Sequence, residues 1–585
     1  MFYLASDIIS LKDVTFSYKG SKRRALDGIT LNVKQGECVA ILGPTGAGKS
    51  TLACVMNGTA PRFMDGSLAG DVTVDGMVPA KVGTAQMASR VGLVFGDPDT
   101  QLFGMTVEED VAFGPANLGL GYEGIMERVS KSIGDMRLSG LERRAPHRLS
   151  GGQKQATAIA GVYAMLPKIM VLDEPTSMLD PEGKARVFGI VRMLKEQLGV
   201  TVVLIEQEVD DILNLADRVF VMRSGKFVLS GTPREVFGRV EELRQAGVRV
   251  PQIVEFGTLI GATETPFSIE EAMLAVGSEP TTVGDATKAP SRAAHEVRKV
   301  HDAGNAQDDA VVQALNVEFT YPGGARALDG VNLAVGRGDF VAIVGQNGAG
   351  KTTLTRHFNG LLRPSSGDIR VLGRSAQGVP TIELCRHVGY VFQNPDEQLF
   401  CTSVQEELKF GPTNIGADPH VTSQRVEEIL GDIGLTKYRE VWPKYLTKGE
   451  RQRLALASVV AMDPDVLIVD EPTTGLDWVE SLQILDYLER LRNERKKTII
   501  IITHDMNIVS LYARRVVVMA KGRVVGDGTA REIFSQPDLM ELACLRRPPI
   551  ADLSQALWGE VLLTPAEAAA RLLAAKSQAA GVCSE

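Results

Sequence analysis

Two glycine-rich segments carry the residues whose types and spacing are suited to chemistry. They are GPTGAGKST at 43–51 and GQNGAGKTT at 345–353, and both follow the pattern GxxxxGK[ST]. Each comes after a strand-like apolar run, at 38–42 and 340–344, and before a helical pattern. In that order the glycines let the backbone approach a phosphate group, N–H groups cradle it, and the helix start favours its negative charge. The segments therefore predict phosphate binding, because a chance glycine-rich turn would not recur in this context.

Within the two loops, the lysines and the hydroxyl residues have separate expected roles. Lys49 and Lys351 should reach the outer phosphates, and Ser50 and Thr352 should ligate Mg²⁺. The other loop residues are expected to contact the phosphates through the backbone. They are Gly43, Pro44, Thr45, Gly46, Ala47, Gly48 and Thr51 in the first loop, and Gly345, Gln346, Asn347, Gly348, Ala349, Gly350 and Thr353 in the second.

An acidic pair ends each of two later apolar strands, at 169–172 and 466–469. The first carboxylate of such a pair suits Mg²⁺ binding, and the second suits orientation or deprotonation of an attacking water. Asp-Glu-Pro is also an ordinary strand-exit turn, but two copies in the same order favour the chemical interpretation. The pairs are Asp173-Glu174 and Asp470-Glu471.

The elements that must position these residues occur twice in the chain. VFGDPDTQLF at 94–103 is repeated as VFQNPDEQLF at 391–400, and the copies keep a constant offset of 297 residues from Gly96 to Gln207. The chain is therefore a tandem duplication. Residues 278–310 are small and polar, which predicts a flexible linker. The expected parts are a first domain at 1–245, an accessory segment and linker at 246–310, a second domain at 311–546 and a C-terminal tail at 547–585.

Composition excludes several other classes of protein. The 585 residues are 44% hydrophobic and 23% charged, as in soluble proteins of several domains. No run approaches 18 apolar residues and no export signal is visible, so the chain is expected neither to span a membrane nor to be exported. Six widely spaced cysteines suggest reduced thiols. A net charge of -9 argues against broad nucleic-acid binding.

The segment LSGGQ at 149–153 adds a family resemblance. Alone it could be a helix N-cap followed by a glycine turn. Beside the other motifs, it makes both halves resemble ATP-binding cassette (ABC) ATPases over nearly their whole length. The resemblance implies an α/β fold of two tandem P-loop NTPase domains. Each would have a RecA-like core, an antiparallel β subdomain and a helical signature subdomain.

The same resemblance implies ATP and Mg²⁺ as cofactors and a head-to-tail pairing of the two cassettes within the chain. Each ATP would lie between the phosphate loop of one half and the signature segment of the other. Tyr18 and Tyr321 match the adenine-stacking aromatic of the family, although a strand tyrosine can also serve packing alone. The signature residues expected to contact ATP are Ser150, Gly151, Gly152 and Gln153.

The two copies differ at positions that the family uses for catalysis. Gln393, expected to contact Mg²⁺ and the attacking water, has Gly96 as its counterpart. His504 matches the switch histidine that contacts the γ-phosphate, and its counterpart is Gln207. The second signature segment reads LTKGE at 446–450. Head-to-tail pairing assigns all three departures to one composite site.

The other composite site keeps every expected group. We therefore predict one hydrolytic site, whose catalytic residues are Glu471, His504 and Gln393, and one site that mainly holds nucleotide. The weaker site should still bind Mg-ATP because its lysine, serine and acidic pair remain. In the alternative hypothesis, the substitutions are tolerated and both sites hydrolyse ATP. The intact site joins Lys351, Thr352, Gln393, Asp470, Glu471 and His504 to Ser150, Gly151, Gly152 and Gln153.

The PDxQLF segments, followed by FGP at 113–115 and 410–412, resemble the energy-coupling factor class of importers. Gln101 and Gln398 match the second glutamine of that class. Such importers take up vitamins, vitamin precursors, or cobalt and nickel ions. The resemblance implies two partners, a transmembrane coupling subunit and a membrane substrate-binding subunit. It also implies a peripheral position at the cytoplasmic face of the cell membrane.

Other tandem ATPases remain as alternatives. A sugar-type ABC importer also fuses two cassettes, but the PDxQ segment is not expected there. A soluble ribosome-associated ABC ATPase would be expected to have a basic linker, whereas residues 278–310 contain four basic and six acidic residues, or 4 − 6 = −2. A DNA-repair ATPase would bring zinc cysteines or a long coiled coil, and the sequence has neither. No nucleic-acid partner is therefore expected.

Overall fold

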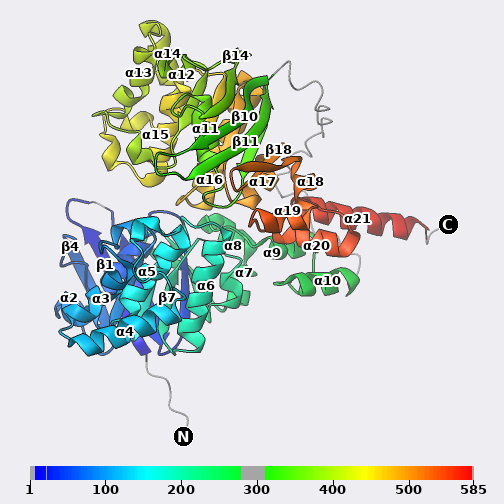
Figure 1. The fold of residues 1–585 in the computed structure, drawn as a ribbon. Helices are drawn as coiled ribbons and strands as arrows, with labels where there is room; N and C mark the ends of the chain where they lie inside the picture. The colour runs from blue at the N-terminus through cyan, green and yellow to red at the C-terminus, as the bar shows by residue number, and fades with distance from the viewer. Residues whose placement is uncertain (1–6, 22, 208, 279–309, 583–585) are drawn as a thin grey trace. The chain divides into compact units, whose positions relative to one another are not determined.

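The computed structural model describes residues 7–21, 23–207, 209–278 and 310–582 (Figure 1). Contacts divide the chain into two units. The boundary between the units lies inside α9 (Gln252–Leu259), whereas the sequence predicts that the first domain ends at residue 245. The predicted flexible linker at 278–310 lies outside the described residues apart from its two end positions. Unit 1 is Met1–Val254 with Asp477–Val479, and unit 2 is Glu255–Leu476 with Glu480–Glu585.

Unit 1 contains two sheets. A three-stranded antiparallel sheet has the order β2-β1-β4, and a six-stranded sheet has the order β5-β6-β7-β3-β8-β9, with only β9 antiparallel. Every residue of β3, β6 and β7 is buried, as expected for parallel strands covered on both faces. The strands are β1 (Asp7–Tyr18), β2 (Leu26–Lys34), β3 (Cys38–Leu42), β4 (Gly66–Val74), β5 (Val91–Phe95), β6 (Ile169–Asp173), β7 (Thr201–Ile205), β8 (Arg218–Arg223) and β9 (Lys226–Gly231).

A helical subdomain is inserted in unit 1 between β5 and β6. Its helices α3, α4 and α5 pack against one another, and α5 also packs against α6 and β5. The longer helices of this unit are α1 (Lys49–Met56), α3 (Val107–Asn117), α4 (Tyr122–Asp135), α5 (Gly151–Tyr163), α6 (Pro181–Glu196) and α8 (Val240–Ala246); the short ones are α2 (Thr84–Ala88) and α7 (Pro233–Phe237).

Unit 2 repeats this architecture. Its antiparallel sheet has the order β11-β10-β13-β14, and its six-stranded sheet β15-β16-β17-β12-β18-β19 matches that of unit 1 strand for strand. The duplication read from the sequence and the predicted fold class are therefore confirmed. The strands are β10 (Ala310–Thr320), β11 (Arg326–Gly336), β12 (Phe340–Val344), β13 (Ser366–Val371), β14 (Arg374–Ser375), β15 (Val388–Val391), β16 (Val466–Asp470), β17 (Thr498–Ile502), β18 (Arg515–Ala520) and β19 (Arg523–Gly528).

The helices of unit 2 include the segments that the sequence separated as an accessory segment and a tail. Helix α10 (Ile269–Ser278) packs against α20 (Pro549–Trp558), and Ala551 and Val561 belong to the main hydrophobic core of the unit. The tail is thus folded. The spacing of apolar residues at 565–578 predicts an amphipathic helix, and this stretch lies within α21 (Pro565–Val582). The remaining helices are α11 (Lys351–Phe358), α12 (Thr381–Cys385), α13 (Val404–Asn414), α14 (Pro419–Asp432), α15 (Lys448–Val460), α16 (Trp478–Arg495), α17 (Met506–Tyr512), α18 (Ala530–Phe534) and α19 (Pro537–Leu542).

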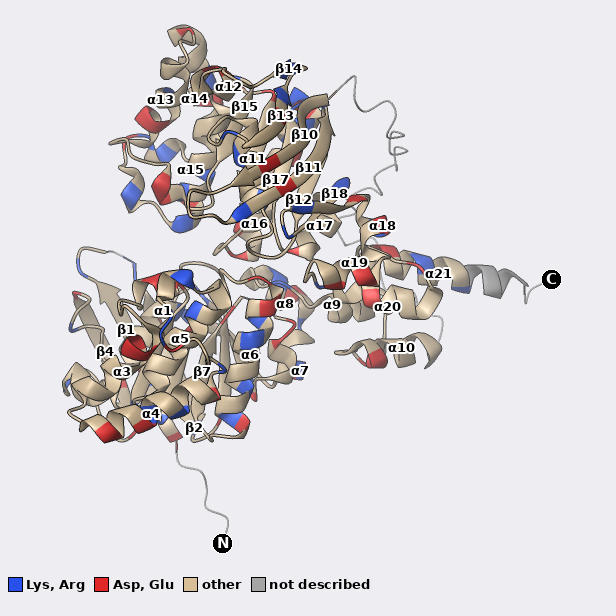
Figure 2. Ribbon diagram, in the orientation of Figure 1, with Lys and Arg blue, Asp and Glu red and all other residues tan. Residues whose placement is uncertain are grey.

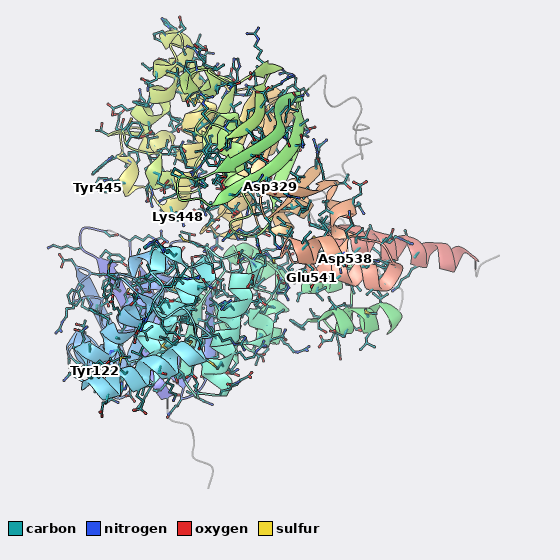
Figure 3. All side chains as sticks on the ribbon, in the orientation of Figure 1. Tyr122, Asp329, Tyr445, Lys448, Asp538 and Glu541 are labelled. Carbon is teal, nitrogen blue, oxygen red and sulfur yellow. The ribbon has the colours of Figure 1, made fainter. Side chains whose placement is uncertain are left out.

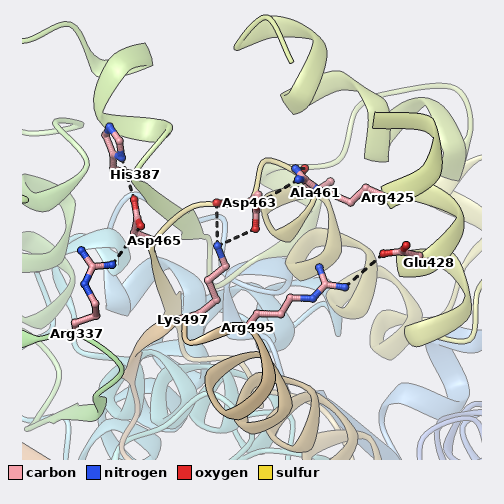
Figure 4. A network of polar contacts seen from close by, with 9 residues as sticks. All are labelled: Arg337, His387, Arg425, Glu428, Ala461, Asp463, Asp465, Arg495 and Lys497. Carbon is pink, nitrogen blue, oxygen red and sulfur yellow. Dashed lines mark hydrogen bonds and ion pairs between the residues drawn. The ribbon is translucent and has the colours of Figure 1, made fainter. Parts of the chain in front are cut away.

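A polar network holds the turn that leads into β16, the strand that delivers the second acidic pair (Figure 4). Asp465 lies 3.0 Å from His387 and 3.6 Å from Arg337, and Asp463 contacts Lys497 at 2.8 Å and Arg425 at 3.1 Å. These contacts come from the β-strand core and from α14. The contacts tie the start of β16 to the strand core and to α14. They therefore help to hold the acidic pair at the other end of this strand.

Charged residues of both signs are mixed along the helices α13, α14 and α15 (Figure 2). Within the described part of the chain, none of the helices combines the length and the apolar character that crossing a bilayer requires.

Candidate functional site

The two phosphate loops have nearly the same geometry. Gly43 and Gly345 have φ values of 145° and 147°, and a Cβ at either position would lie 2.1 Å from a main-chain oxygen of the neighbouring β8 or β18. Only glycine fits there. The lysine side chains fold back over the loops, because Lys49 Nζ donates to the Gly43 oxygen at 2.7 Å and Lys351 Nζ to the Gly345 oxygen at 2.7 Å. Both amines are buried at the start of a helix, where they face the cradle for a phosphate.

The first carboxylate of each acidic pair suits Mg²⁺. Asp173 and Asp470 are the last residues of β6 and β16, and Ser50 and Thr352 hydrogen-bond to them. One buried oxygen of each carboxylate, Oδ1, has no hydrogen-bond partner among the described residues. Buried polar atoms are usually paired, so such an oxygen is available to a cation. Burial raises the pKa of Asp173 to about 6 and also raises the pKa of Asp470.

The second carboxylate of each pair stands in a left-handed backbone conformation, with φ of 52° at Glu174 and 47° at Glu471. His504 Nδ1 lies 2.9 Å from Glu471 Oε1. Burial raises the pKa of Glu471, but the neighbouring His504 and Lys351 outweigh it and hold the pKa below its usual range. Glu471 is therefore held as a carboxylate beside the residue that the sequence assigned to the γ-phosphate.

Gln207 takes the place of His504 in unit 1. Its Nε2 donates to Glu174 Oε1 at 2.8 Å, so the amide holds the carboxylate as the imidazole does. The substitution therefore preserves the position of the acid and replaces the imidazole beside it with an amide.

A buried carboxylate that the sequence analysis missed adds to this difference. Glu206 is 1% exposed, and its Oε1 accepts hydrogen bonds from the main chain and hydroxyl of Thr176, the latter at 2.7 Å. Its counterpart at the same offset is Thr503. The first site thus carries an additional acidic residue next to Gln207, and comparison of the two copies would have found it.

Gly96 and Gln393 occupy different surroundings. Gln393 is exposed just after β15, whereas a Cβ built on Gly96 would lie 2.6 Å from the main-chain oxygen of Glu174. A glutamine at position 96 would therefore require the backbone around Glu174 to move. The main chain of unit 1 thus leaves no room for a glutamine side chain at position 96, so restoring the glutamine would require more than a side-chain change.

The glutamine of each PDxQ motif, Gln101 or Gln398, holds its segment in place through hydrogen bonds. Gln101 accepts from the Phe95 amide at 2.8 Å and donates to the Leu93 oxygen at 3.2 Å. Gln398 donates to the Ala455 oxygen at 2.7 Å, on α15. Gln398 therefore ties its segment to the signature helix.

Both signature segments form helix starts. Ser150 caps α5 in a capping box with Gln153, and Thr447 caps α15 in a capping box with Glu450, whose carboxylate accepts from the Thr447 amide at 2.9 Å. Threonine and glutamate thus preserve the cap. The two caps differ in charge, because Glu450 is acidic and Gln153 is neutral.

The two tyrosines assigned to adenine lie at equivalent places. The hydroxyl of Tyr18 lies 2.8 Å from that of Thr51, and the hydroxyl of Tyr321 lies 3.1 Å from that of Thr353. Each tyrosine is 37% exposed. The hydroxyls anchor the rings next to the phosphate loops and leave part of each ring accessible for stacking.

Tyr390 is a further site residue that the sequence analysis missed. Its buried hydroxyl donates to Asp470 Oδ2 at 2.8 Å and lies 3.5 Å from the hydroxyl of Thr355. The counterpart at the same offset is Leu93, which cannot make this bond. Of the two acidic pairs, which both lie in the described residues, the second alone therefore has this tyrosine bonded to its first carboxylate, and the difference between the copies was the available signal.

We expect Tyr390→Phe to raise the Mg²⁺ concentration that gives half-maximal ATPase activity at least about tenfold, because a hydrogen bond to a charged group contributes about 1.5–3 kcal/mol. The measurement is ATPase rate against free Mg²⁺ at saturating ATP. Tyr512→Phe is the matched control, since Tyr512 donates to Asp486 at 2.7 Å away from the acidic pair. An equal shift in both variants would contradict a specific role for Tyr390.

Known proteins similar to this chain are ABC transporter ATP-binding proteins. The sequence model of the ABC transporter family matches residues 26–177 and 328–474. A putative ABC transporter ATP-binding protein of Caldanaerobacter subterraneus subsp. tengcongensis is 40% identical over 96% of this chain and 98% of its own length. One of Methanosarcina acetivorans is 40% identical over 93% of this chain and 90% of its own. Among solved structures, cbiO1 of Clostridium perfringens, described as part of the ABC transporter complex cbiONQ, is 37% identical, covers 42% of this chain and 99% of its own, and has a TM-score of 0.38.

Proposed function

Since this chain belongs to the ABC transporter family and is an ATPase that binds ATP with Mg²⁺, we propose that it powers an importer of the energy-coupling factor type. The imported substrate would be a vitamin, a vitamin precursor or a transition-metal ion, and it would pass through separate membrane subunits. The chain would bind the cytoplasmic face of the membrane through a transmembrane coupling subunit. A membrane substrate-binding subunit would complete the complex.

The observation that supports this proposal best is a pair of exposed aromatic residues after each PDxQ segment. Phe103 and Phe113 are 63% and 52% exposed, and Phe400 and Phe410 are 61% and 44% exposed. In each pair the rings meet edge to face, with centroids 4.5 Å and 4.7 Å apart. Exposed apolar groups of this kind mark interaction sites.

The backbone beneath each ring pair is held by a buried carboxylate. Asp110 accepts from the Phe103 amide at 2.9 Å, and Glu407 accepts from the Phe400 amide at 2.9 Å. A rigid backbone under exposed rings favours docking, because little side-chain or main-chain freedom is lost on binding. The same device in both units fits a coupling subunit that contacts both cassettes.

We expect the double substitution Phe103→Glu and Phe400→Glu to reduce copurification of membrane subunits at least about tenfold, since each buried aromatic anchor typically contributes 2 kcal/mol or more. The ATPase rate of the purified chain should remain within about twofold. Tyr122→Glu serves as the control, because Tyr122 is 77% exposed at the start of α4 and belongs to neither ring pair (Figure 3).

The proposed importer can be tested by purifying the chain from the membranes of the cells that produce it and identifying the proteins that copurify. We expect integral membrane proteins. Cosedimentation with ribosomes and none with membranes would contradict the proposal and support a ribosome-associated ATPase. If the membrane partner has the architecture of a sugar importer, the chain is still an ATPase, but the energy-coupling factor assignment is wrong.

We further propose that the two composite ATP sites are unequal. In this mechanism the second-half groups, Lys351, Asp470, Glu471 and His504, work with the signature helix α5, and Glu471 orients or deprotonates the attacking water. Mg²⁺, held by Thr352, Asp470 and Gln393, would neutralise charge on the phosphates. The first-half loop would work with α15 and would mainly hold ATP. ATP binding would close the two halves, and hydrolysis at one site would reopen them.

A further inference from the structure

In each unit, one ion pair joins the aspartate of the PDxQ motif to the signature helix. In unit 1, Lys154 Nζ donates to both carboxylate oxygens of Asp99, at 2.7 Å and 2.9 Å. Lys154 directly follows Gln153 of the signature segment, and its main-chain N–H donates to the Ser150 oxygen at 2.8 Å. The lysine therefore belongs to the first turn of α5. A single side chain connects this helix start to the PDxQ segment.

Unit 2 has the same link with a different cation. Arg451, the counterpart of Lys154 at the offset of 297, forms an ion pair with Asp396, with Nε 2.9 Å from Oδ1. Arg451 Nη1 also donates to the oxygen of Leu446, the first residue of the second signature segment, at 2.7 Å. The guanidinium group thus bridges the main chain of the signature segment and the carboxylate of the PDxQ motif.

The other hydrogen bonds between segment and helix are not the same in the two units. In unit 1 the fully buried Gln155 of α5 donates to the Phe95 oxygen, at the end of β5, at 3.0 Å. In unit 2 the bond runs in the opposite direction, from Gln398 of the segment to the Ala455 oxygen of α15. Among these contacts, the ion pair is the one that both units make with equivalent residues.

The ion pair of unit 1 lies close to the exposed ring pair. The side chain of Lys154 is 19% exposed and that of Asp99 is 64% exposed, and Phe103 follows Asp99 by four residues. Exposed ion pairs contribute little to folding stability. A lysine that binds both oxygens of one carboxylate nevertheless sets the position of that carboxylate relative to the helix. The pair therefore fixes where the segment that leads to Phe103 lies against α5.

We propose that the Asp99–Lys154 ion pair makes the PDxQ segment of unit 1 move with α5, so that ATP bound at the start of α5 changes the position of the exposed Phe103 ring. Asp396 and Arg451 act in the same way in unit 2. The inference rests on the proposed function, in which α5 contacts ATP and Phe103 contacts the coupling subunit. Since such coupling is reciprocal, a partner bound at Phe103 also changes the affinity for ATP.

The test uses the full chain with Glu471→Gln, which prevents turnover at the site that α5 is proposed to complete. Hydrogen exchange is measured by mass spectrometry in peptides spanning 97–105 and 149–157, with and without Mg-ATP. We expect Mg-ATP to slow exchange in both peptides. Lys154→Met should reduce the factor at 97–105 about threefold, the scale expected for a partly exposed ion pair, and leave the factor at 149–157 unchanged.

Two further variants separate the ion pair from a general effect of the substitution. Lys154→Arg should keep the factor at 97–105, because arginine makes the equivalent ion pair in unit 2. Lys195→Met is the matched control, since Lys195 is 21% exposed and pairs with Asp217 at 2.8 Å. It should also keep the factor. An equal loss in Lys154→Arg and Lys154→Met would contradict a role for the charge.

The remaining outcomes also decide the matter. An unchanged factor at 97–105 in Lys154→Met would overturn the proposal, as would a parent in which ATP slows exchange at 149–157 alone. If Lys154→Met reduces the factor equally in both peptides, the lysine acts on ATP binding itself and the proposal is wrong. No ATP-dependent change in either peptide of the parent would contradict the contact between α5 and ATP, and with it this inference. Docking of the coupling subunit is tested separately, by copurification with the Phe103 and Phe400 variants.

Discussion

Glu471→Gln is expected to reduce the ATPase rate of the full chain about 100-fold or more, whereas Glu174→Gln should leave about half of the rate or more. The amide has nearly the same shape as the carboxylate but cannot accept the proton of the attacking water. Glu471 lies beside His504, and its lowered pKa keeps it as the carboxylate that the proposed mechanism requires. Glu174 stands beside Gln207, with Gly96 where the water-contacting glutamine is expected.

The measurement is steady-state phosphate release at saturating Mg-ATP, with binding of a fluorescent ATP analogue measured on the same preparations. Both variants should still bind nucleotide, because their phosphate loops are unchanged. Equal losses of rate in the two variants would contradict the unequal-site mechanism and favour two active sites. EDTA should abolish the activity of the parent, as expected for a Mg²⁺-dependent reaction.

Gly151→Asp is expected to lower the ATPase rate about 100-fold, while Lys448→Asp, at the equivalent position of the other half, should change it less than about threefold. A carboxylate at the first residue of α5 would oppose the negative charge that this helix start is proposed to hold. The site has room for the added side chain after a small shift of Leu179, since a Cβ on Gly151 would lie 3.1 Å from the Leu179 Cδ2 methyl and 3.9 Å from the Met178 oxygen.

This pair of variants tests which signature helix serves the hydrolytic site. Gly152 would be a poorer choice, because its Cβ would lie 2.8 Å from the backbone of α6 and would disturb the fold. Thermal unfolding of the Gly151 and Lys448 variants is the control for folding. A large loss of rate with Lys448→Asp and a small one with Gly151→Asp would reverse the assignment of the pairing.

Much of the fold could be predicted because its signals are local. The buried runs at 38–42 and 466–469 predict strands by length and composition, and both are found in β3 and β16. The sequence predicts a tail at 547–585 with a helix at 565–578, and it does not predict that this tail is folded into the core. Its burial could not be foreseen, because Ala551 and Val561 are apolar residues whose core partners lie far away in the sequence.

The sequence by itself determined the duplication, the phosphate loops, the acidic pairs and the loss of Gln393 and His504 from the first copy. Each of these depends on residue type at a fixed spacing along the chain. Only the tertiary structure decided that Tyr390 bonds to Asp470, that Lys154 pairs with Asp99, and that Gly96 is crowded by the Glu174 main chain. Those contacts join segments that meet only after the parallel strands and their crossover helices have packed, so no local pattern records them.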